Sequence, residues 1–239
     1  MKKIIHKAES RGFADHGWLQ ANHSFSFANW FDKERIQFGA LRVLNDDLIA
    51  PSMGFSTHPH QNMEIITIPL SGKLKHKDNL ANEWLTVESN EVQVMSAGTG
   101  VYHSEMNASV NDHLSLFQLW ILPYKEGVFP RHDQKVFNSE DRKNKLQIVV
   151  SSFDDEENSG LKIHQNAQIS RLDLEENIEF KYQFKYNNSG VYLMNISGKI
   201  LVDSTLLKQR DAIGLSETSD FTIKALETSE LLLVEVPML

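Results

Sequence analysis

Two short segments decide the fold and the chemistry that we predict for this chain: THPHQNME at residues 57–64 and GVYHSE at residues 100–105. Each contains two metal-capable side chains two residues apart, and residues i and i+2 of a β-strand point to the same face. If the two strands lie side by side, the four side chains converge. The spacing therefore predicts a metal site formed by His58, His60, His103 and Glu105.

The surroundings of both segments favour a metal site over an incidental histidine pair. An isolated His-x-His is common, and most histidines are half-exposed surface residues or bonded core groups. Here the run 65–68 follows the first pair and the run 92–95 precedes the second, and both are rich in β-branched or apolar residues typical of buried strands. Gly98 and Gly100 predict a tight bend just before His103.

The rest of the chain predicts an all-β fold with an internal duplication. Short apolar runs follow one another at close spacing and are separated by turn residues, which is typical of a sandwich or barrel. LSGKL at residues 70–74 has a close counterpart in ISGKI at residues 196–200, each preceded by a strand pattern. We therefore expect two β domains, an N-terminal one at 1–135 that binds metal and a C-terminal one at 136–239.

The second domain has no comparable set of ligands in the sequence. When Gly72 is aligned with Gly198, Phe184 and Tyr186 take the positions of the two histidines of the first segment. No histidine follows His164. We expect the C-terminal domain to lack a metal and to bury both aromatic side chains in its interior.

Composition limits the classes of function. The chain has 239 residues, 41% of them apolar, and a formal net charge of −8, which argues against direct binding to nucleic acid. It contains no cysteine, so a metal would have nitrogen and oxygen ligands. Neither a signal peptide nor a run of ~20 apolar residues is evident, so we expect no contact with a membrane and a cytoplasmic location.

The motifs resemble those of the cupin superfamily, and within it the pirin family. His58-Pro59-His60 with Glu64 and Gly72 is similar to the first cupin motif, and residues 100–107 are similar to the second. Further segments that look like pirin signatures are ADHGWL at 14–19, HSFSF at 23–27, FGALRV at 38–43, MSAGTGV at 95–101, HSE at 103–105 and QLWILP at 118–123. The C-terminal half is similar mostly in outline.

The resemblance implies a bicupin, with two cupin-type β-sandwich or barrel domains in one chain. It implies one divalent transition metal on His58, His60, His103 and Glu105, with Fe(II) favoured, although the same ligands suit Ni, Mn, Co, Cu or Zn. Bacterial pirins are associated with quercetin 2,3-dioxygenase activity, and the animal relative is described as an iron-dependent transcriptional cofactor. Fold inheritance alone does not determine activity.

Three functions remain open at this level. The first is a dioxygenase that uses O2 to cleave the ring of a flavonol such as quercetin or a similar small planar phenolic compound. The second is a non-enzymatic regulator whose metal controls binding to a protein partner. The third is another cupin chemistry, such as isomerisation of a small oxo-compound. An enclosed apolar cavity beside the metal would favour an enzyme, and an exposed charged rim would favour the regulator.

Two carboxylates compete for a place in the site. Glu64 lies four residues beyond His60, roughly 13 Å along an extended strand at ~3.3 Å per residue, so it cannot share a metal with both histidines without a bulge. We therefore assign Glu105 as ligand and as a possible base, and Glu64 as a neighbouring pocket residue or alternative base.

Several large side chains could line an apolar pocket for a planar ring, although core packing explains them equally well. For Phe25 and Phe27 the strand-core interpretation is favoured. The candidates for the pocket are Phe25, Phe27, Phe55, Met63, Tyr102 and Trp120.

Overall fold

A computed structural model describes residues 1–81 and 83–239 of the chain. Nearly all regular structure in these residues is β-strand, with two short 3-10 helices, η1 (Ala8–Ser10) and η2 (Ser139–Arg142). Within the described residues no helix has the length and apolar character needed to cross a membrane. The predicted all-β fold is confirmed.

The N-terminal half forms a sandwich of a large and a small sheet. The large sheet has the order β12 (Arg131–Val136), β9 (Glu91–Ser96), β6 (Glu64–Ser71), β11 (Leu114–Ile121), β4 (Leu41–Ile49), β3 (Leu19–His23) and β2 (Gly12–Asp15). The small sheet has the order β5 (Gly54–His60), β10 (Val101–Asn107), β7 (Lys73–Asp78) and β8 (Leu85–Glu88). An apolar cluster that includes Leu74, Val87 and Leu116 packs between the two sheets.

The C-terminal half forms a second sandwich. Its large sheet has the order β1 (Lys2–His6), β20 (Ala212–Ser216), β17 (Ser189–Ser197), β22 (Ser229–Pro237), β15 (Gln168–Leu174), β13 (Gln147–Ser152) and β14 (Leu161–Ile163). Its small sheet has the order β16 (Glu179–Gln183), β21 (Asp220–Ala225), β18 (Ile200–Val202) and β19 (Thr205–Leu207). A second apolar cluster, which includes Tyr182, Leu193 and Phe221, fills this sandwich.

The central strands of the two large sheets correspond, so the predicted duplication is confirmed. The pairs β6 and β17, β11 and β22, and β4 and β15 occupy the same places in the two large sheets. The turn after β6 contains Gly72 at φ +85°, and the turn after β17 contains Gly198 at φ +80°. Both backbone angles lie in the left-handed region that favours glycine, which explains the repeated glycine of the two SGK turns.

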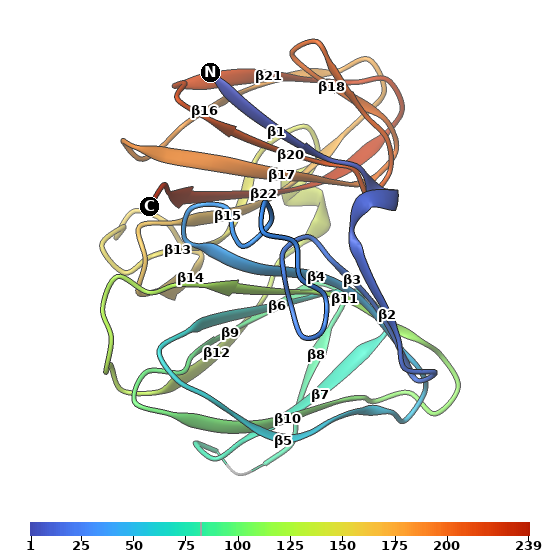
Figure 1. The fold of residues 1–239 in the computed structure, drawn as a ribbon, viewed down its shortest axis with the longest axis vertical. Helices are drawn as coiled ribbons and strands as arrows, with labels where there is room; N and C mark the ends of the chain where they lie inside the picture. Colours follow the sequence, from blue (N-terminus) through green and yellow to red (C-terminus); the bar gives the residue numbers. More distant parts are fainter. Residues whose placement is uncertain (82) are drawn as a thin grey trace.

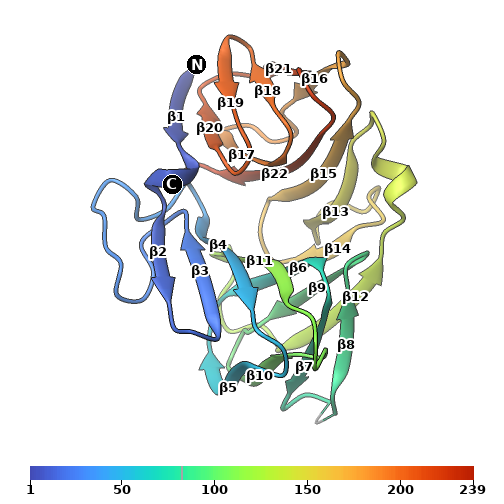
Figure 2. The ribbon, with the colours of Figure 1, turned by 90° about the vertical axis from the view of Figure 1, so that its right-hand side faces the viewer.

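The chain's first strand departs from the predicted division at residue 135. β1 pairs with β20 in the second large sheet, at the place that β12 takes beside β9 in the first. Figure 2 shows the chain leaving β1 in the upper sandwich and passing through η1 to β2 in the lower one. Residues 2–6 therefore complete the C-terminal sheet, while the boundary near residue 135 stays a prediction.

The predicted positions of Phe184 and Tyr186 also need correction. Both lie beyond the end of β16, in the connection to β17, and are only partly buried. The connection from β16 to β17 spans residues 184–188, whereas β5 and β6 are separated only by residues 61–63. An alignment on the turn glycines alone therefore matches the two histidines of β5 with residues of the longer connection, and not with residues of β16.

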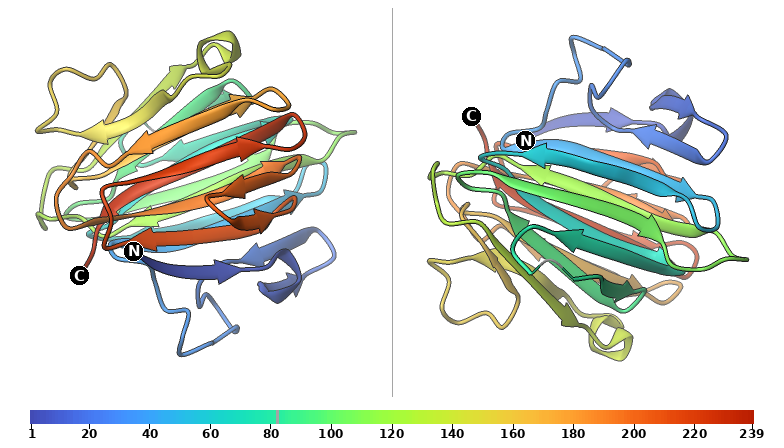
Figure 3. Two further views of the ribbon diagram at one scale, coloured as in Figure 1. Left: turned by 90° about the horizontal axis from the view of Figure 1, so that it is seen from above. Right: turned by 90° about the horizontal axis from the view of Figure 1, so that it is seen from below.

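The two large sheets pack face to face in the middle of the molecule, and the small sheets lie outside them (Figure 1). Their strands run in similar directions when viewed from above or below (Figure 3), as in aligned sheet packing. The largest apolar cluster spans this interface and includes Leu44, Ile66 and Phe117 from one half with Ile169 and Val234 from the other. Burying this surface joins the two sandwiches into one body.

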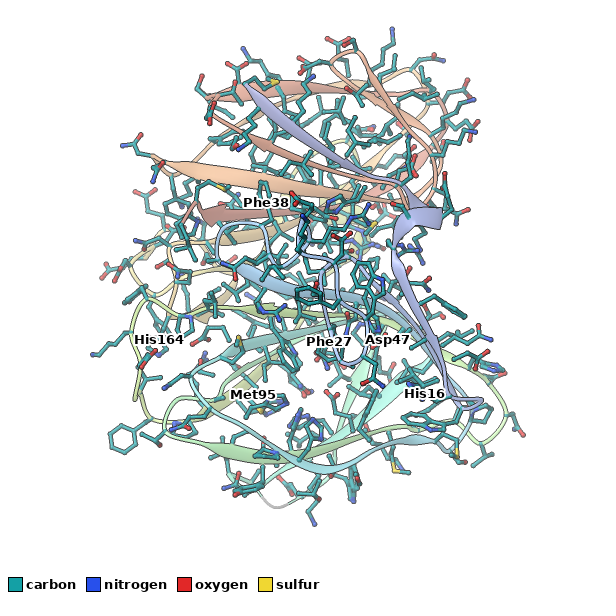
Figure 4. All side chains as sticks on the ribbon, in the orientation of Figure 1. His16, Phe27, Phe38, Asp47, Met95 and His164 are labelled. Carbon is teal, nitrogen blue, oxygen red and sulfur yellow. The ribbon has the colours of Figure 1, made fainter. Side chains whose placement is uncertain are left out.

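Phe38 connects the N-terminal half to the second large sheet, and Figure 4 labels it at the level of the interface. Its ring lies over two glycines, where there is no room for another atom. A Cβ placed on Gly214 would lie 2.6 Å from Phe38 Cε2, and one placed on Gly190 would lie 2.7 Å from Phe38 Cζ. The sheet accepts the ring only because both positions have no side chain.

We predict that Gly214→Ala lowers the free energy of unfolding by about 1–3 kcal/mol, because the added methyl group overpacks this contact. Urea unfolding of the single variants and of the double variant with Phe38→Ala measures the effect. In the Phe38→Ala background the cost of the alanine should largely disappear. An equal cost in both backgrounds would contradict the assigned contact.

Candidate metal centre and cavity

Three imidazoles meet on the inner face of the small N-terminal sheet. β10 pairs with β5 so that His103 lies directly opposite His58, and Val101 lies opposite His60. The ring centroids of His58 and His103 are 4.3 Å apart, those of His60 and His103 4.8 Å, and those of the two β5 histidines 4.9 Å. One nitrogen from each ring lies within 4.8 Å of the other two. The structure thus brings together the three histidines that the sequence paired by spacing.

A β-bulge beside the histidines adjusts the side chains of β5. The register of β10 against β5 shifts between His103 and Glu105, and Glu105 lies opposite Phe55. The extra residue allows both Phe55 and the two β5 histidines to face the interior, which regular alternation would forbid. His58 is further oriented by its Nδ1, which lies 2.8 Å from the backbone oxygen of Ser56 and donates to it. This leaves Nε2 as the ligand atom.

Glu105 faces inward beside His103 but belongs to a second group. Its Oε2 accepts a 2.9 Å hydrogen bond from Gln118 Nε2, and Gln118 Oε1 accepts a 2.7 Å bond from Thr67 Oγ1. Atoms of His76, His103 and Glu105 lie within 4.8 Å of one another. The four predicted ligands therefore form two overlapping groups that share His103.

Sequence reasoning missed His76, which is fully buried on β7 directly opposite Glu105. Its Nε2 lies 3.1 Å from Asp78 Oδ2, and its Nδ1 lies 3.8 Å from Glu105 Oε1, a distance too long for a hydrogen bond. Its ring stacks on His132 at 4.9 Å between centroids. A signal was present, because KLKHKD at residues 73–78 places Leu74, His76 and Asp78 on one face and three lysines on the other.

Burial sets the protonation of these groups. It lowers the pKa of His103 to about 4, and together with the charge of His58 it lowers the pKa of His60 to about 4. Burial alone would raise the pKa of Glu105, but the imidazoles of His76 and His103 and the Gln118 amide hold it well below its usual range. At neutral pH His60 and His103 therefore offer neutral imidazoles and Glu105 offers an ionised carboxylate, the forms that bind metals.

The buried atoms of this site fit a metal ion. Both ring nitrogens of His103, which is 1% exposed, lack a hydrogen-bond partner among the described residues, and so does Glu105 Oε1. Buried polar atoms in proteins are almost always bonded. Nitrogen and oxygen ligands that stand unpaired around one point are what a divalent transition metal requires.

His58, His60 and Glu105 line a cavity of about 330 Å³ between the two N-terminal sheets. Of the predicted pocket residues, Phe27, Phe55 and Trp120 line it. The Trp120 ring lies 4.9 Å from that of His60 and 5.3 Å from that of Phe27, so aromatic surface borders the ligand group directly. The size and the mainly apolar wall are typical of a small-molecule site.

The other three predicted pocket residues do not line this cavity. Phe25 packs in the interface between the sandwiches, with its ring 5.2 Å from that of Tyr192, because β3 ends at His23 and the expected alternation stops there. Met63 packs against the small apolar cluster that contains Met95 and is not a lining residue. Tyr102 alternates with His103 on β10 and is 57% exposed on the outer face.

Glu64 does not reach the imidazoles. It alternates with Ile65, which packs with Val101 on the cavity side, so its own side chain points to the interface between the sandwiches. There Oε2 accepts a 2.7 Å hydrogen bond from Ser96 Oγ. Burial raises the pKa of Glu64 to about 7, an effect that the Ser96 bond partly offsets. Neither a pocket role nor a base role suits a carboxyl on this face.

Comparison with known proteins agrees with this geometry. Residues 5–121 match the family model described as Pirin, and residues 148–236 match the model of the quercetinase C-terminal cupin domain. A quercetin 2,3-dioxygenase of Escherichia coli strain K12 is 37% identical over 233 residues, covering 98% of each chain. The chain belongs to the pirin family.

Other pirin relatives extend the likeness over the whole chain. A pirin-like protein of Caulobacter vibrioides is 42% identical over 224 residues, which is 94% of this chain and 95% of the relative. The crystal structure of a bacterial pirin from Escherichia coli in complex with nickel(II) covers 100% of both chains with a TM-score of 0.92 and 36% identity. The pirin fold and its two cupin domains are therefore shared along the full length.

We predict that Glu64→Gln changes the pH dependence of stability and leaves metal content unchanged. The folded-state pKa of about 7 lies above the ordinary value of 4.5, so folding takes up a proton between these values. The stability that Glu64 contributes is full below pH 4.5 and is lost as the pH rises through 7, on the order of 3 kcal/mol in total. Urea unfolding between pH 4.5 and 8 should therefore show a smaller decline in Glu64→Gln than in wild type. Parallel declines, or a loss of bound metal, would contradict the assignment.

Proposed function

We propose that this protein is a metal-dependent dioxygenase that acts on a flavonol such as quercetin. The observation that supports the proposal most is the group of three imidazoles, with Glu105 beside it, at the wall of an aromatic-lined cavity. The names of its relatives point to the same chemistry. An apolar cavity next to the ligand group favours an enzyme over a regulator, whose metal would face a charged rim.

The residues proposed to bind one divalent transition metal are His58, His60, His103 and Glu105. Fe(II) remains the favoured ion from the sequence resemblance, and nickel(II) is bound by the Escherichia coli pirin. When bound, the metal would supply Lewis acidity toward the hydroxyl and carbonyl oxygens of the flavonol and a centre for reaction with O2.

Gln118 holds the carboxylate in place for this chemistry. Its amide binds Glu105 Oε2, and Thr67 fixes the other end of the amide, so the carboxylate is oriented before substrate arrives. Oε1 has no partner among the described residues and can accept a proton from the substrate hydroxyl. Because the pKa of Glu105 is low, this transfer requires that the hydroxyl be made more acidic or that the carboxylate loosen from the metal.

The side chains that line the cavity indicate the class of substrate. Phe27, Phe55 and Trp120 offer flat apolar surfaces that exclude water and suit a planar aromatic ring. The proposed partners are therefore a small planar phenolic compound and O2. The cytoplasmic location stays a prediction.

We predict that one metal binds per chain and that His103→Ala abolishes binding, because His103 belongs to both ligand groups. Elemental analysis after reconstitution measures the occupancy. The exposed His113→Ala variant is the matched control and should retain full occupancy. Chelation should lower the melting temperature of wild type but leave that of His103→Ala unchanged, since only a bound metal stabilises the native state. Full occupancy in His103→Ala would rule out this site.

We further predict quercetin-dependent O2 uptake by the reconstituted protein, and a fall of at least ~10²-fold in Glu105→Gln at equal metal content. Separate reconstitution with Fe(II), Mn, Co, Ni and Cu tests the choice of metal in the same assay. Glu64→Gln is the control, because that carboxyl points away from the cavity, and should keep near-normal turnover. Wild-type protein that is inactive with every metal would overturn the proposed activity.

A further inference from the structure

Asp47 is a second carboxyl group in the same cavity, on the opposite sheet from the histidines. β4 alternates so that Asp47 faces the cavity, with Ala21 of β3 on one side and Leu116 of β11 on the other. Figure 4 labels Asp47 together with Phe27 and His16 in the lower sandwich, where the cavity lies. Its neighbours in the sheet are apolar and give it nothing to bind.

The carboxyl of Asp47 is buried and incompletely bonded. Asp47 is 5% exposed, and its Oδ1 has no hydrogen-bond partner among the described residues. The preceding residue provides the contrast, because Asp46 faces the other side of the sheet and pairs with Arg11 at 3.0 Å and Arg210 at 3.1 Å. Leaving a buried carboxyl oxygen unpaired costs free energy, so an oxygen left in this state on a cavity wall indicates a ligand.

The unpaired oxygen of Asp47 defines what this residue can bind. Burial raises the pKa of the carboxyl to about 8, so its surroundings do not favour the charged form. In either protonation state, Oδ1 can accept a hydrogen bond. A phenolic hydroxyl donates such a bond and is its natural partner.

The position of Asp47 allows one ligand to contact both Asp47 and the end of the cavity where Glu105 and the proposed metal lie. Asn45, two residues earlier on β4, lies opposite Gln118, the residue that holds Glu105. The Asn45 side chain is already hydrogen-bonded, since its Oδ1 lies 2.9 Å from His23 Nδ1. Asp47 lies two residues beyond Asn45 on the same face of the strand, roughly 7 Å away. A bicyclic ring can span this distance.

We propose that Asp47 binds a phenolic hydroxyl on the part of the substrate remote from the metal, and so selects polyhydroxylated planar aromatics over those with a single hydroxyl. This inference rests on the proposed function and adds a specificity-determining residue to it. A site built to pair with a hydroxyl rejects the analogue that lacks one, because the buried polar group is then left unpaired.

Anaerobic calorimetric titration of the Ni(II)-loaded protein tests the proposal without turnover. Quercetin, with several hydroxyls, is compared with 3-hydroxyflavone, which has only the hydroxyl next to the carbonyl. Wild type should bind quercetin at least about 10-fold more tightly. Asp47→Leu should reduce this preference to less than about threefold by weakening quercetin binding, and Asp47→Asn, which keeps a donor and an acceptor, should restore part of it.

Asp46→Asn is the matched control, one residue away on the other face, and should leave the preference unchanged. Metal content and far-UV circular dichroism verify that each variant is folded. A wild type that binds both flavonols equally, or an Asp47→Leu variant that keeps the full preference, overturns the inference even if quercetin is turned over. Intact discrimination without O2 uptake contradicts the proposed activity and supports the role of Asp47. No binding of either flavonol overturns both.

Discussion

The register of β10 between its two neighbours is the constraint on which the site depends. On one side it sets His103 against His58, and on the other it sets Glu105 against His76. A slip of one residue would turn both ligands of β10 to solvent, because side chains alternate with a period of two. Val101, which is buried on the same face of β10, opposes such a slip because the slip would expose it as well.

The large N-terminal sheet serves two interiors at once, which explains its many buried polar residues. One face packs against the C-terminal sandwich and the other forms the cavity wall. Neighbouring residues on a strand therefore have unrelated roles: Asp46 forms ion pairs at the interface while Asp47 faces the cavity, and Glu64 faces the interface while Ile65 packs on the cavity side. The C-terminal sandwich supplies no ligand in this arrangement. It covers the outer face of the sheet that supports the site.

Several features of the fold and of the site can be predicted from local patterns in the sequence. The i, i+2 spacing of His58 with His60 was sufficient to predict that these side chains share a face, and the repeated SGK turn was sufficient to predict two copies of one fold. Glu64 could be excluded as a ligand from strand length alone. These inferences succeed because each depends on residues that are close in sequence.

The predictions from the sequence fail where pairing between strands distant in the chain determines the position of a side chain. Nothing near residue 23 shows that β3 ends there, so the sequence offers Phe25 and Phe27 alike as strand-core or pocket residues. In the structure Phe25 packs between the sandwiches and Phe27 lines the cavity. Only the pairing partner reveals that β1 joins the second sheet, and only the sheet order brings His76 beside Glu105. The bulge that turns Phe55 inward likewise depends on the register with β10.

The most direct test of the account is the position of the metal relative to His103, which the two ligand groups share. Crystals of the Ni(II)-loaded protein, with diffraction recorded at the nickel absorption edge, would locate the ion by its anomalous scattering. We expect one strong peak per chain within bonding distance of nitrogen atoms of His58, His60 and His103 and of an oxygen of Glu105. A peak bound by His76, His103 and Glu105, with the histidines of β5 unligated, would contradict it.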